Sequence, residues 1–198
     1  MSSSAAHRLP TFEELYKAIE ALPPGLTGEI LEPGVIRTMG RPGGPHRISA
    51  RTIWRSLREY DTWEGGHGWW LEQEAELRLL PDRLVVPDLS GWRIARDTPL
   101  PPGFVFDNPI VERPSWCCEI LSRSTERIDR EQKVPLYVQA GVQWIWLVDP
   151  EARRVEVLRA DDAEAKVVEI LEGDAKRAIP PFSSVFDTSS WWVSPPSR

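Results

Sequence analysis

Two carboxylates, Glu119 and Asp88, lie in or next to apolar segments, where a charged side chain is unusual. Glu119 lies in the middle of the run Trp116-Cys-Cys-Glu-Ile-Leu121, where burying a bare carboxylate without a partner is costly. Asp88 follows Val85-Val-Pro87, at the end of a second apolar segment. Two carboxylates on neighbouring strands suit Mg²⁺, which binds through one or two carboxylates, waters and substrate phosphate. The pair therefore predicts a metal-assisted site that polarises a phosphodiester and lowers the pKa of a bound water.

The strand that carries Glu119 opens a strand–helix–strand unit. Residues Ser115–Leu121 are apolar enough for burial on both faces, as in the middle of a sheet. A helix over 125–140 follows and ends at Gly141, where a left-handed cap costs glycine little. Gln143–Val148 forms the next strand. This crossover should place its two strands parallel or nearly so.

The remaining segments supply the rest of an α/β domain. A capping box of Thr11 and Glu14 begins a helix that runs from Phe12 to Ala21. The other expected elements are two strand pieces around a Pro33-Gly34 turn in Glu29–Met39, a helix over His46–Tyr60, a hairpin of Trp69–Leu80 and Leu84–Trp92 turned at Pro81-Asp82-Arg83, a Pro-rich loop over Thr98–Pro114, strands at 154–160 and 166–171, and a packed tail over Ile179–Phe186. We expect a disordered tail at 1–9, one domain over 10–193 with a mixed central sheet flanked by helices, and a second tail at 194–198.

Composition restricts the classes of protein that this chain can belong to. With 198 residues, a net charge of -6 and a pI near 5.2, it is not built to coat nucleic acid non-specifically. Cys117 and Cys118 are adjacent, which suits neither a structural disulfide nor a zinc site and favours a reducing cytoplasm. The N-terminus lacks the apolar stretch of a signal peptide, and no run approaches membrane-spanning length.

The motifs around the two carboxylates, taken together, resemble a known nuclease family. Pro87-Asp88 is followed, 31 residues after the aspartate, by Glu119-Ile-Leu121, then by Asp129-Arg-Glu-Gln-Lys133-Val-Pro-Leu-Tyr137 and by Trp144-Ile-Trp-Leu-Val-Asp-Pro150. This combination resembles the Uma family of putative restriction endonucleases, a branch of the PD-(D/E)XK nuclease superfamily; Gly28-Glu29-Ile-Leu-Glu32 and Pro45-His46 match more weakly. The resemblance implies a restriction-endonuclease-like fold.

The resemblance also implies a catalytic triad. Asp88 and Glu119 would bind Mg²⁺ or Mn²⁺, and a basic residue would assist the attacking water or stabilise the charge that builds on phosphorus. In most of the superfamily that base lies two residues beyond the glutamate, a position that Leu121 occupies here. Lys133 matches the position of the base in the Uma family, on the following helix, where Pro135 predicts a kink or a late start.

Other charged residues have a structural reading beside the functional one. Glu29 is an accessory acidic candidate or a charge at a strand edge. Three arginines before the proposed base either bind substrate phosphates or form a solvated, neutralised face: Arg123, Arg127 and Arg130. A second row at helical spacing either binds phosphates or, as we slightly favour, forms a solvated face: Arg47, Arg51, Arg55 and Arg58. No two of the three histidines, at 7, 46 and 67, have metal-ligand spacing.

These observations predict a Mg²⁺-dependent endodeoxyribonuclease. We expect a cytoplasmic homodimer acting on DNA, since two sites are needed to cut two strands and exposed tryptophans could pack together. The missing strand lysine and the acidic charge leave open a catalytically inactive nuclease-like module that binds nucleic acid or a protein partner. A weaker alternative is a sugar hydrolase with the two carboxylates as acid and base, which would survive a chelator.

Overall fold

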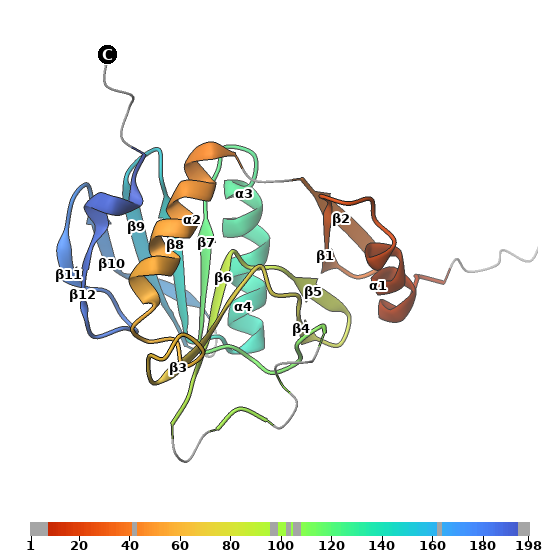
Figure 1. Cartoon of the computed structure of the whole chain (residues 1–198). Coiled ribbons are helices and arrows are strands. Elements are labelled where there is room, and N and C mark those ends of the chain that lie inside the picture. The colour runs from red at the N-terminus through yellow and green to blue at the C-terminus, as the bar shows by residue number, and fades with distance from the viewer. Residues whose placement is uncertain are drawn as a thin grey trace, which may run out of the picture.

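A six-stranded mixed sheet runs through the centre of the molecule (Figure 1). The computed structural model describes residues 8–40, 43–95, 99–101, 104, 108–161 and 164–193. Strands β7 and β8 are parallel and the other neighbours antiparallel, which confirms the predicted mixed sheet. In spatial order the strands are β10 (Ala165–Glu172), β9 (Arg154–Ala160), β8 (Trp144–Asp149), β7 (Trp116–Ile120), β6 (Leu89–Arg93) and β3 (Trp69–Gln73).

The predicted crossover between β7 and β8 is present, and its helix has three parts. These are α3 (Glu126–Ile128), a π-helical turn (Asp129–Lys133) and α4 (Val134–Ala140), ended by Gly141 at φ 81°. In the π turn the Val134 N–H donates to the carbonyl of Asp129, five residues back. Pro135 follows directly, at a position where its missing N–H is tolerated. The proline therefore leaves the helix continuous, and the irregularity falls in the turn before it.

Helices cover both faces of the sheet, and β7 divides its side chains between them. On one face, Cys118 and Ile120 pack in a cluster with residues of α2 (Gly44–Leu57), which begins two residues before the predicted start. On the other face, Cys117 and Leu121 pack with Leu136 and Tyr137 of the crossover helix. Because strand residues alternate, Glu119 points to this second face, toward α4.

The predicted hairpin over 69–92 is divided between two sheets. Its outer parts, β3 and β6, belong to the large sheet. Its tip, β4 (Leu77–Leu80) and β5 (Arg83–Val85), joins β1 (Thr27–Glu32) and β2 (Val35–Met39) in a four-stranded sheet next to α1 (Phe12–Glu20) (Figure 1). The strands break at Glu74, which has a φ of 50°, and at Pro87, which cannot donate to a ladder. Asp88 therefore lies where the two sheets meet.

The C-terminal segment closes the core on the α2 side. Ile179, Phe182 and Phe186 are buried there, which confirms the predicted packing of 179–186. A two-stranded ladder of β11 (Lys176–Ala178) and β12 (Val185–Asp187) and a 3-10 turn (Thr188–Trp191) were not predicted, because each is only three or four residues long. Among the described residues, no helix is long and apolar enough to cross a membrane.

Some predicted segments fall outside the described residues. This holds for 1–7 of the expected N-terminal tail and for the whole of 194–198. Arg8 and Leu9, the described part of the N-terminal tail, are exposed. Much of the predicted Pro-rich loop, at 98, 102–103 and 105–107, also lies outside them.

Replacing Phe182 by alanine should lower the free energy of unfolding by about 3 to 5 kcal/mol, the cost of removing a buried phenyl ring. The ring contacts five other aromatic rings, those of Tyr60, Trp69, Trp116, Trp146 and Phe186. Urea unfolding measures the loss. Val185→Ala, three residues away at a side chain that is 69% exposed, is the matched control and should change stability by less than about 0.5 kcal/mol.

Candidate active site

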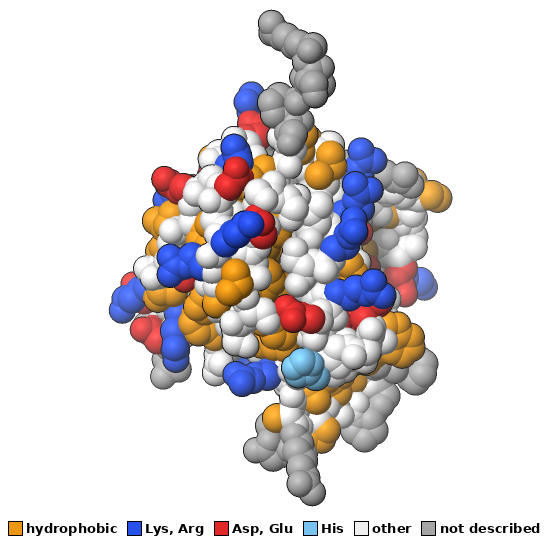
Figure 2. Space-filling view, turned by 60° about the vertical axis from the view of Figure 1, so that its left-hand side comes forward, with side chains coloured by type: hydrophobic (Ala, Val, Ile, Leu, Met, Phe, Trp, Pro, Cys, Tyr) orange, Lys and Arg blue, Asp and Glu red, His pale blue; other side chains and the backbone are white. Residues whose placement is uncertain are grey.

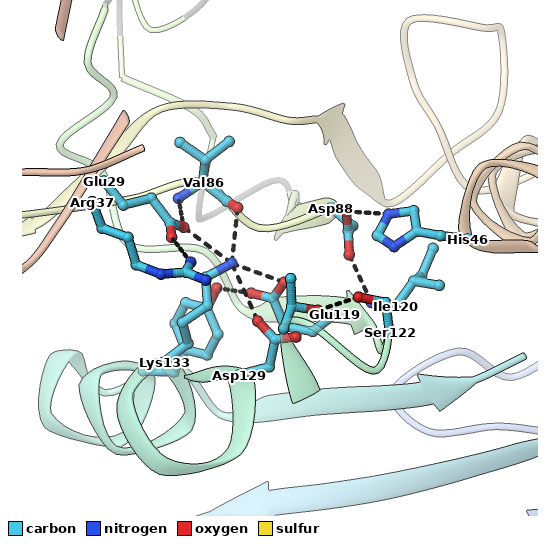
Figure 3. A network of polar contacts seen from close by, with 12 residues as sticks. Glu29, Arg37, His46, Val86, Asp88, Glu119, Ile120, Ser122, Asp129 and Lys133 are labelled. Atoms are coloured by element: carbon cyan, nitrogen blue, oxygen red, sulfur yellow. Dashed lines mark hydrogen bonds and ion pairs between the residues drawn. The ribbon is translucent and has the colours of Figure 1, made fainter. Parts of the chain in front are cut away.

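Four segments meet where the two sheets join, and each contributes an acidic side chain. Glu29 comes from β1, Asp88 from the link before β6, Glu119 from β7 and Asp129 from the π turn (Figure 3). The two catalytic candidates are neighbours: β6 and β7 pair Leu89 with Cys118, and the antiparallel register brings the preceding and following residues together. The Asp88 Oδ2 atom accepts a hydrogen bond of 2.7 Å from the backbone N–H of Ile120.

Lys133 occupies the centre of this acidic cluster. Its Nζ lies 3.0 Å from Glu119 Oε2, 3.0 Å from Glu29 Oε1 and 3.8 Å from Asp129 Oδ1. It also donates a hydrogen bond of 3.0 Å to the backbone carbonyl of Val86 (Figure 3). The lysine side chain is only 4% exposed, so its charge is balanced almost wholly by these groups.

Lys133 is an ammonium group and not a free amine. Burial alone lowers the pKa of a lysine. The carboxylates of Glu119, Glu29, Asp129 and Asp88 outweigh burial and raise the pKa of Lys133 above its ordinary value. A lysine in this state donates hydrogen bonds and supplies positive charge, but it does not accept a proton.

Glu119 is held on both of its oxygens. Tyr137, on α4, donates a hydrogen bond to Oε1, and Lys133 contacts Oε2. Burial raises the pKa of Glu119 well above its ordinary value; Lys133 and Tyr137 lower it, while Asp129 and Asp88 raise it further. Burial likewise raises the pKa of Asp129. The cluster therefore holds protons more tightly than isolated carboxyl groups would.

Asp88 faces a different partner. Its Oδ1 lies 2.7 Å from Nε2 of His46, which comes from the first turns of α2. Burial lowers the pKa of His46, but Asp88 and, more weakly, Asp129 raise it, and the net pKa is above the ordinary histidine value. The Asp88 side chain is 17% exposed, against 2% for Glu119, so it is the carboxylate of the pair that solvent reaches.

Glu29 is not a strand-edge charge exposed to solvent. Its carboxylate is fully buried, accepts a 3.0 Å hydrogen bond from the Val86 N–H and lies 3.4 Å from Nη1 of Arg37 on β2. Together with its contact to Lys133, this makes Glu29 part of the same network as Glu119.

The residues fit a hard divalent cation by charge and by donor type. Counted as ionised, Glu29, Asp88, Glu119 and Asp129 carry four negative charges, against the positive charges of Lys133, Arg37 and protonated His46. Each carboxylate oxygen of Asp88 and Glu119 has a second lone pair beyond the one that its hydrogen-bond donor uses. Within the described ranges no group of three or more His, Cys, Asp or Glu side chains is arranged to hold a metal. Two carboxylates suffice for Mg²⁺, which otherwise keeps water or phosphate oxygens.

The comparisons with known proteins agree with this arrangement. Residues 11–187 match the Uma2 family, described as "Putative restriction endonuclease". The chain belongs to the Uma2 family. A crystal structure of a putative nuclease of the DUF820 family from Anabaena variabilis ATCC 29413 has a TM-score of 0.66 at 21% identity, covering 92% of this chain and 97% of that one. The similarity confirms the restriction-endonuclease-like fold. No protein of curated function matches the chain.

In this Uma2 chain the arginines before Lys133 are engaged elsewhere. Arg130 forms a two-point ion pair with Glu156 of β9, with both distances 2.9 Å, and a further contact to Glu126. Arg123 and Arg127 lie at the surface in ion pairs with Glu151 and Glu131. None of these contacts reaches the four carboxylates around Lys133.

An open pocket of about 560 Å³ lies beside Asp88 instead. Its lining includes two exposed arginines of α2, the last residue of β3 and one residue of the β3–β4 link, together with the Asp88–His46 pair: Arg47, Arg51, Gln73, Glu74, Asp88 and His46. Asp88 lines this pocket and its side chain is 17% exposed, so a solute in the pocket can reach the carboxylate.

Sequence reasoning missed three members of the Uma2 site. His46 has no partner at metal-ligand spacing, because its partner is a carboxylate 42 residues away. Asp129 and Tyr137 each lie four residues from Lys133, so helical periodicity alone could have grouped all three on one face. That this face points into the molecule depends on the packing of the helix against β7, which a single sequence does not show.

Replacing Lys133 by methionine should lower the free energy of unfolding at pH 8 by about 3 to 5 kcal/mol, because it leaves buried carboxylates without their cation. Denaturant titration measures the loss. Lys17→Met, on the exposed side of α1, is the control and should be close to neutral.

The cost of Lys133→Met should depend on pH. The folded-state pKa values of Glu119 and Asp129 are raised above their ordinary values of 4.5 and 3.8. Their stabilising contribution is therefore complete below those ordinary values and is lost as the pH rises through the folded-state values. Lys133 lowers both of these pKa values, so its removal should raise them further and make ionisation of the cluster more destabilising at high pH. The difference between variant and wild type should therefore widen from pH 5 to pH 8; a constant difference would contradict ionisation of the cluster.

Proposed function

We propose that this Uma2 protein is a metal-dependent endonuclease that hydrolyses phosphodiester bonds in DNA. The observation that carries the proposal is the adjacency of Asp88 and Glu119 across β6 and β7, with Lys133 Nζ 3.0 Å from the glutamate. This supplies two carboxylates and a cation from different parts of the chain. Family membership and the nuclease-like fold support the same reaction class.

Each residue has a distinct role in this proposal. Asp88 and Glu119 hold Mg²⁺ or Mn²⁺, which when bound polarises the phosphodiester and acidifies a water. Lys133, kept as an ammonium by its carboxylate neighbours, stabilises negative charge that develops at the scissile phosphate. It does not act as the general base. Glu29 and Asp129 keep Lys133 in place, and Tyr137 orients the carboxylate of Glu119.

One observation favours a second candidate, a catalytically inactive nuclease-like module. Both oxygens of Asp88 and both oxygens of Glu119 already accept from protein donors, so the cluster holds together without a metal. The usual position of the base is filled by Leu121, which is buried in the core. Metal binding distinguishes the two candidates, since an inactive module does not need it.

Calorimetric titration with Mn²⁺ should show binding to the wild type and none to the Asp88→Asn/Glu119→Gln variant. The substitutions keep the shape of both side chains and remove the charge that the cation needs. The same variant should fail to nick a supercoiled plasmid that the wild type cleaves with Mg²⁺, and EDTA should stop the wild type. Asp82→Asn, at the exposed hairpin turn, is the matched control and should bind and cleave normally. Cleavage that survives EDTA would argue for the sugar-hydrolase class or another metal-free reaction.

We also propose that the enzyme acts as a homodimer in the cytoplasm. The free, buried Cys117 and Cys118 suit a reducing compartment. Of the tryptophans that the structure describes, Trp63 is the one that is largely exposed, so the tryptophans supply little dimer surface. The edge strand β10 carries Val168 and Ile170 exposed, and supports a sheet-edge interface better.

Light scattering with size-exclusion chromatography should give twice the mass of the 22.5 kDa chain. Val168→Lys should convert the dimer to a monomer, because a charge at an exposed strand edge opposes pairing. Glu172→Lys, at a residue of the same strand whose side chain is 71% exposed and whose surface ion pair with Arg154 contributes little, changes charge without removing the apolar side chain and separates the two effects. A wild-type mass of one chain would contradict the homodimer.

A further inference from the structure

The outer face of α2 carries a row of arginines that the site described above does not use. Arg47, Arg51, Arg55 and Arg58 are all exposed, at successive turns of the helix. Arg58 pairs with Glu64 at 3.1 Å. The other three make no ion pair with any residue that the structure describes. Figure 2 shows a row of Lys and Arg side chains along one side of the molecule, where α2 comes forward.

Two hollows lie along this row. The pocket beside Asp88 is lined by Arg47 and Arg51. A second hollow, of about 340 Å³, is lined one turn further along α2 by Arg55, with the hydroxyl residues Thr52, Ser56 and Ser190. The helix thus presents guanidinium donors from the Asp88 pocket outward, whereas the hydroxyls of Thr52 and Ser56 donate to backbone carbonyls of α2 itself. Arginine is among the side chains that contact the phosphate oxygens of nucleic acids.

The spacing of the row suits a nucleic-acid backbone. From Arg47 to Arg55 the α-helix rises about 12 Å, at about 1.5 Å per residue. One DNA strand rises about 3.4 Å per nucleotide, so the row matches the axial rise of three to four nucleotides. A guanidinium group can bind a phosphate with two parallel hydrogen bonds, which a surface row of lysines would not do.

We propose that Arg47, Arg51 and Arg55 of α2 bind the phosphate backbone of the DNA strand that enters the Asp88 pocket. The proposal rests on the proposed nuclease function and adds the direction from which the DNA approaches Asp88. It also replaces the sequence-based interpretation of the α2 arginines as a solvated face. The arginines before Lys133, which were the sequence-based candidates for the same task, are neutralised by Glu151, Glu131 and Glu156.

The charges of the pocket are consistent with this path. Its arginines come from α2, whereas its acidic residues, Glu74 and Asp88, come from the β3–β4 and β5–β6 links. A bare phosphate is repelled by the carboxylates and attracted by the guanidinium groups. The backbone therefore runs along α2 and approaches the carboxylates only at the phosphate that is to be cleaved.

The test measures binding of a fluorescein-labelled 20-bp DNA duplex by anisotropy, in EDTA so that no cleavage occurs, at several salt concentrations. The variant Arg47→Gln/Arg51→Gln/Arg55→Gln should bind more weakly. The slope of log K against log salt should fall in magnitude by about 2.7, at about 0.9 for each lost phosphate contact. The control Arg123→Gln/Arg127→Gln/Arg153→Gln removes the same charge from surface ion pairs and should keep the wild-type slope.

Several outcomes would overturn the assignment. An equal loss of DNA affinity in both triple variants would show a general charge effect. A wild type that binds no duplex at low salt would exclude the backbone track, that is, DNA backbone binding by Arg47, Arg51 and Arg55. Tighter binding to an RNA duplex would make RNA the occupant. Thermal melting confirms the fold of each variant, and single Arg51→Gln serves if the triple variant is unfolded.

Mn²⁺ titration separates this proposal from the proposed nuclease function. An α2 variant that binds Mn²⁺ and DNA as wild type does refutes the backbone track and leaves the metal site standing. Loss of DNA binding in that variant, with no Mn²⁺ bound by wild type, supports the track and refutes the metal-dependent enzyme.

Discussion

The ammonium group of Lys133 among buried carboxylates is the interaction on which the rest of this structure depends. Glu29, Glu119 and Asp129 come from two different sheets and a helix, and each would be costly to bury without a cation. The lysine therefore joins β1 of the small sheet to β7 of the large one. The packing of the two sheets and the chemistry proposed for the site share one charge, so a change to either should disturb the other.

The division of one hairpin between two sheets creates the space for this cluster. Had the strands continued unbroken from 69 to 92, backbone ladder bonds would occupy the junction. The left-handed Glu74 and the donor-less Pro87 end the large sheet at matching points on both strands. Val86 is left with a free carbonyl and N–H, and these are the groups that bind Lys133 and Glu29. The interruptions at Glu74 and Pro87 thus leave the backbone groups of Val86 free to bind side chains of the site.

The sequence was sufficient for the regular parts of the fold and for the acidic pair. Strand period, the capping box of α1 and the β7–helix–β8 unit all follow from local patterns, and Glu119 was conspicuous as a carboxylate in an apolar strand. The division of the hairpin and the short strand β12 depend on tertiary pairing, which a single sequence does not display. His46 was missed for the same reason, since its role comes from a residue far along the chain. The ion pairs of Arg130 likewise depend on which acidic residues face it, and a single sequence does not display them.

The π turn has a consequence for how sequences of this kind are compared. Such a turn is an α-helix with one residue too many, and each residue of an α-helix turns the chain by about 100°. Deleting one position between Asp129 and Lys133 would restore regular geometry and leave Asp129 three residues before the lysine instead of four. Lys133 and Tyr137 would stay four residues apart on one face, so only the residues before the deletion would change their place relative to both. The contact between Asp129 and the cation thus depends on the length of this segment as well as on the identity of the lysine, and a lysine aligned beside a gap is not an equivalent lysine.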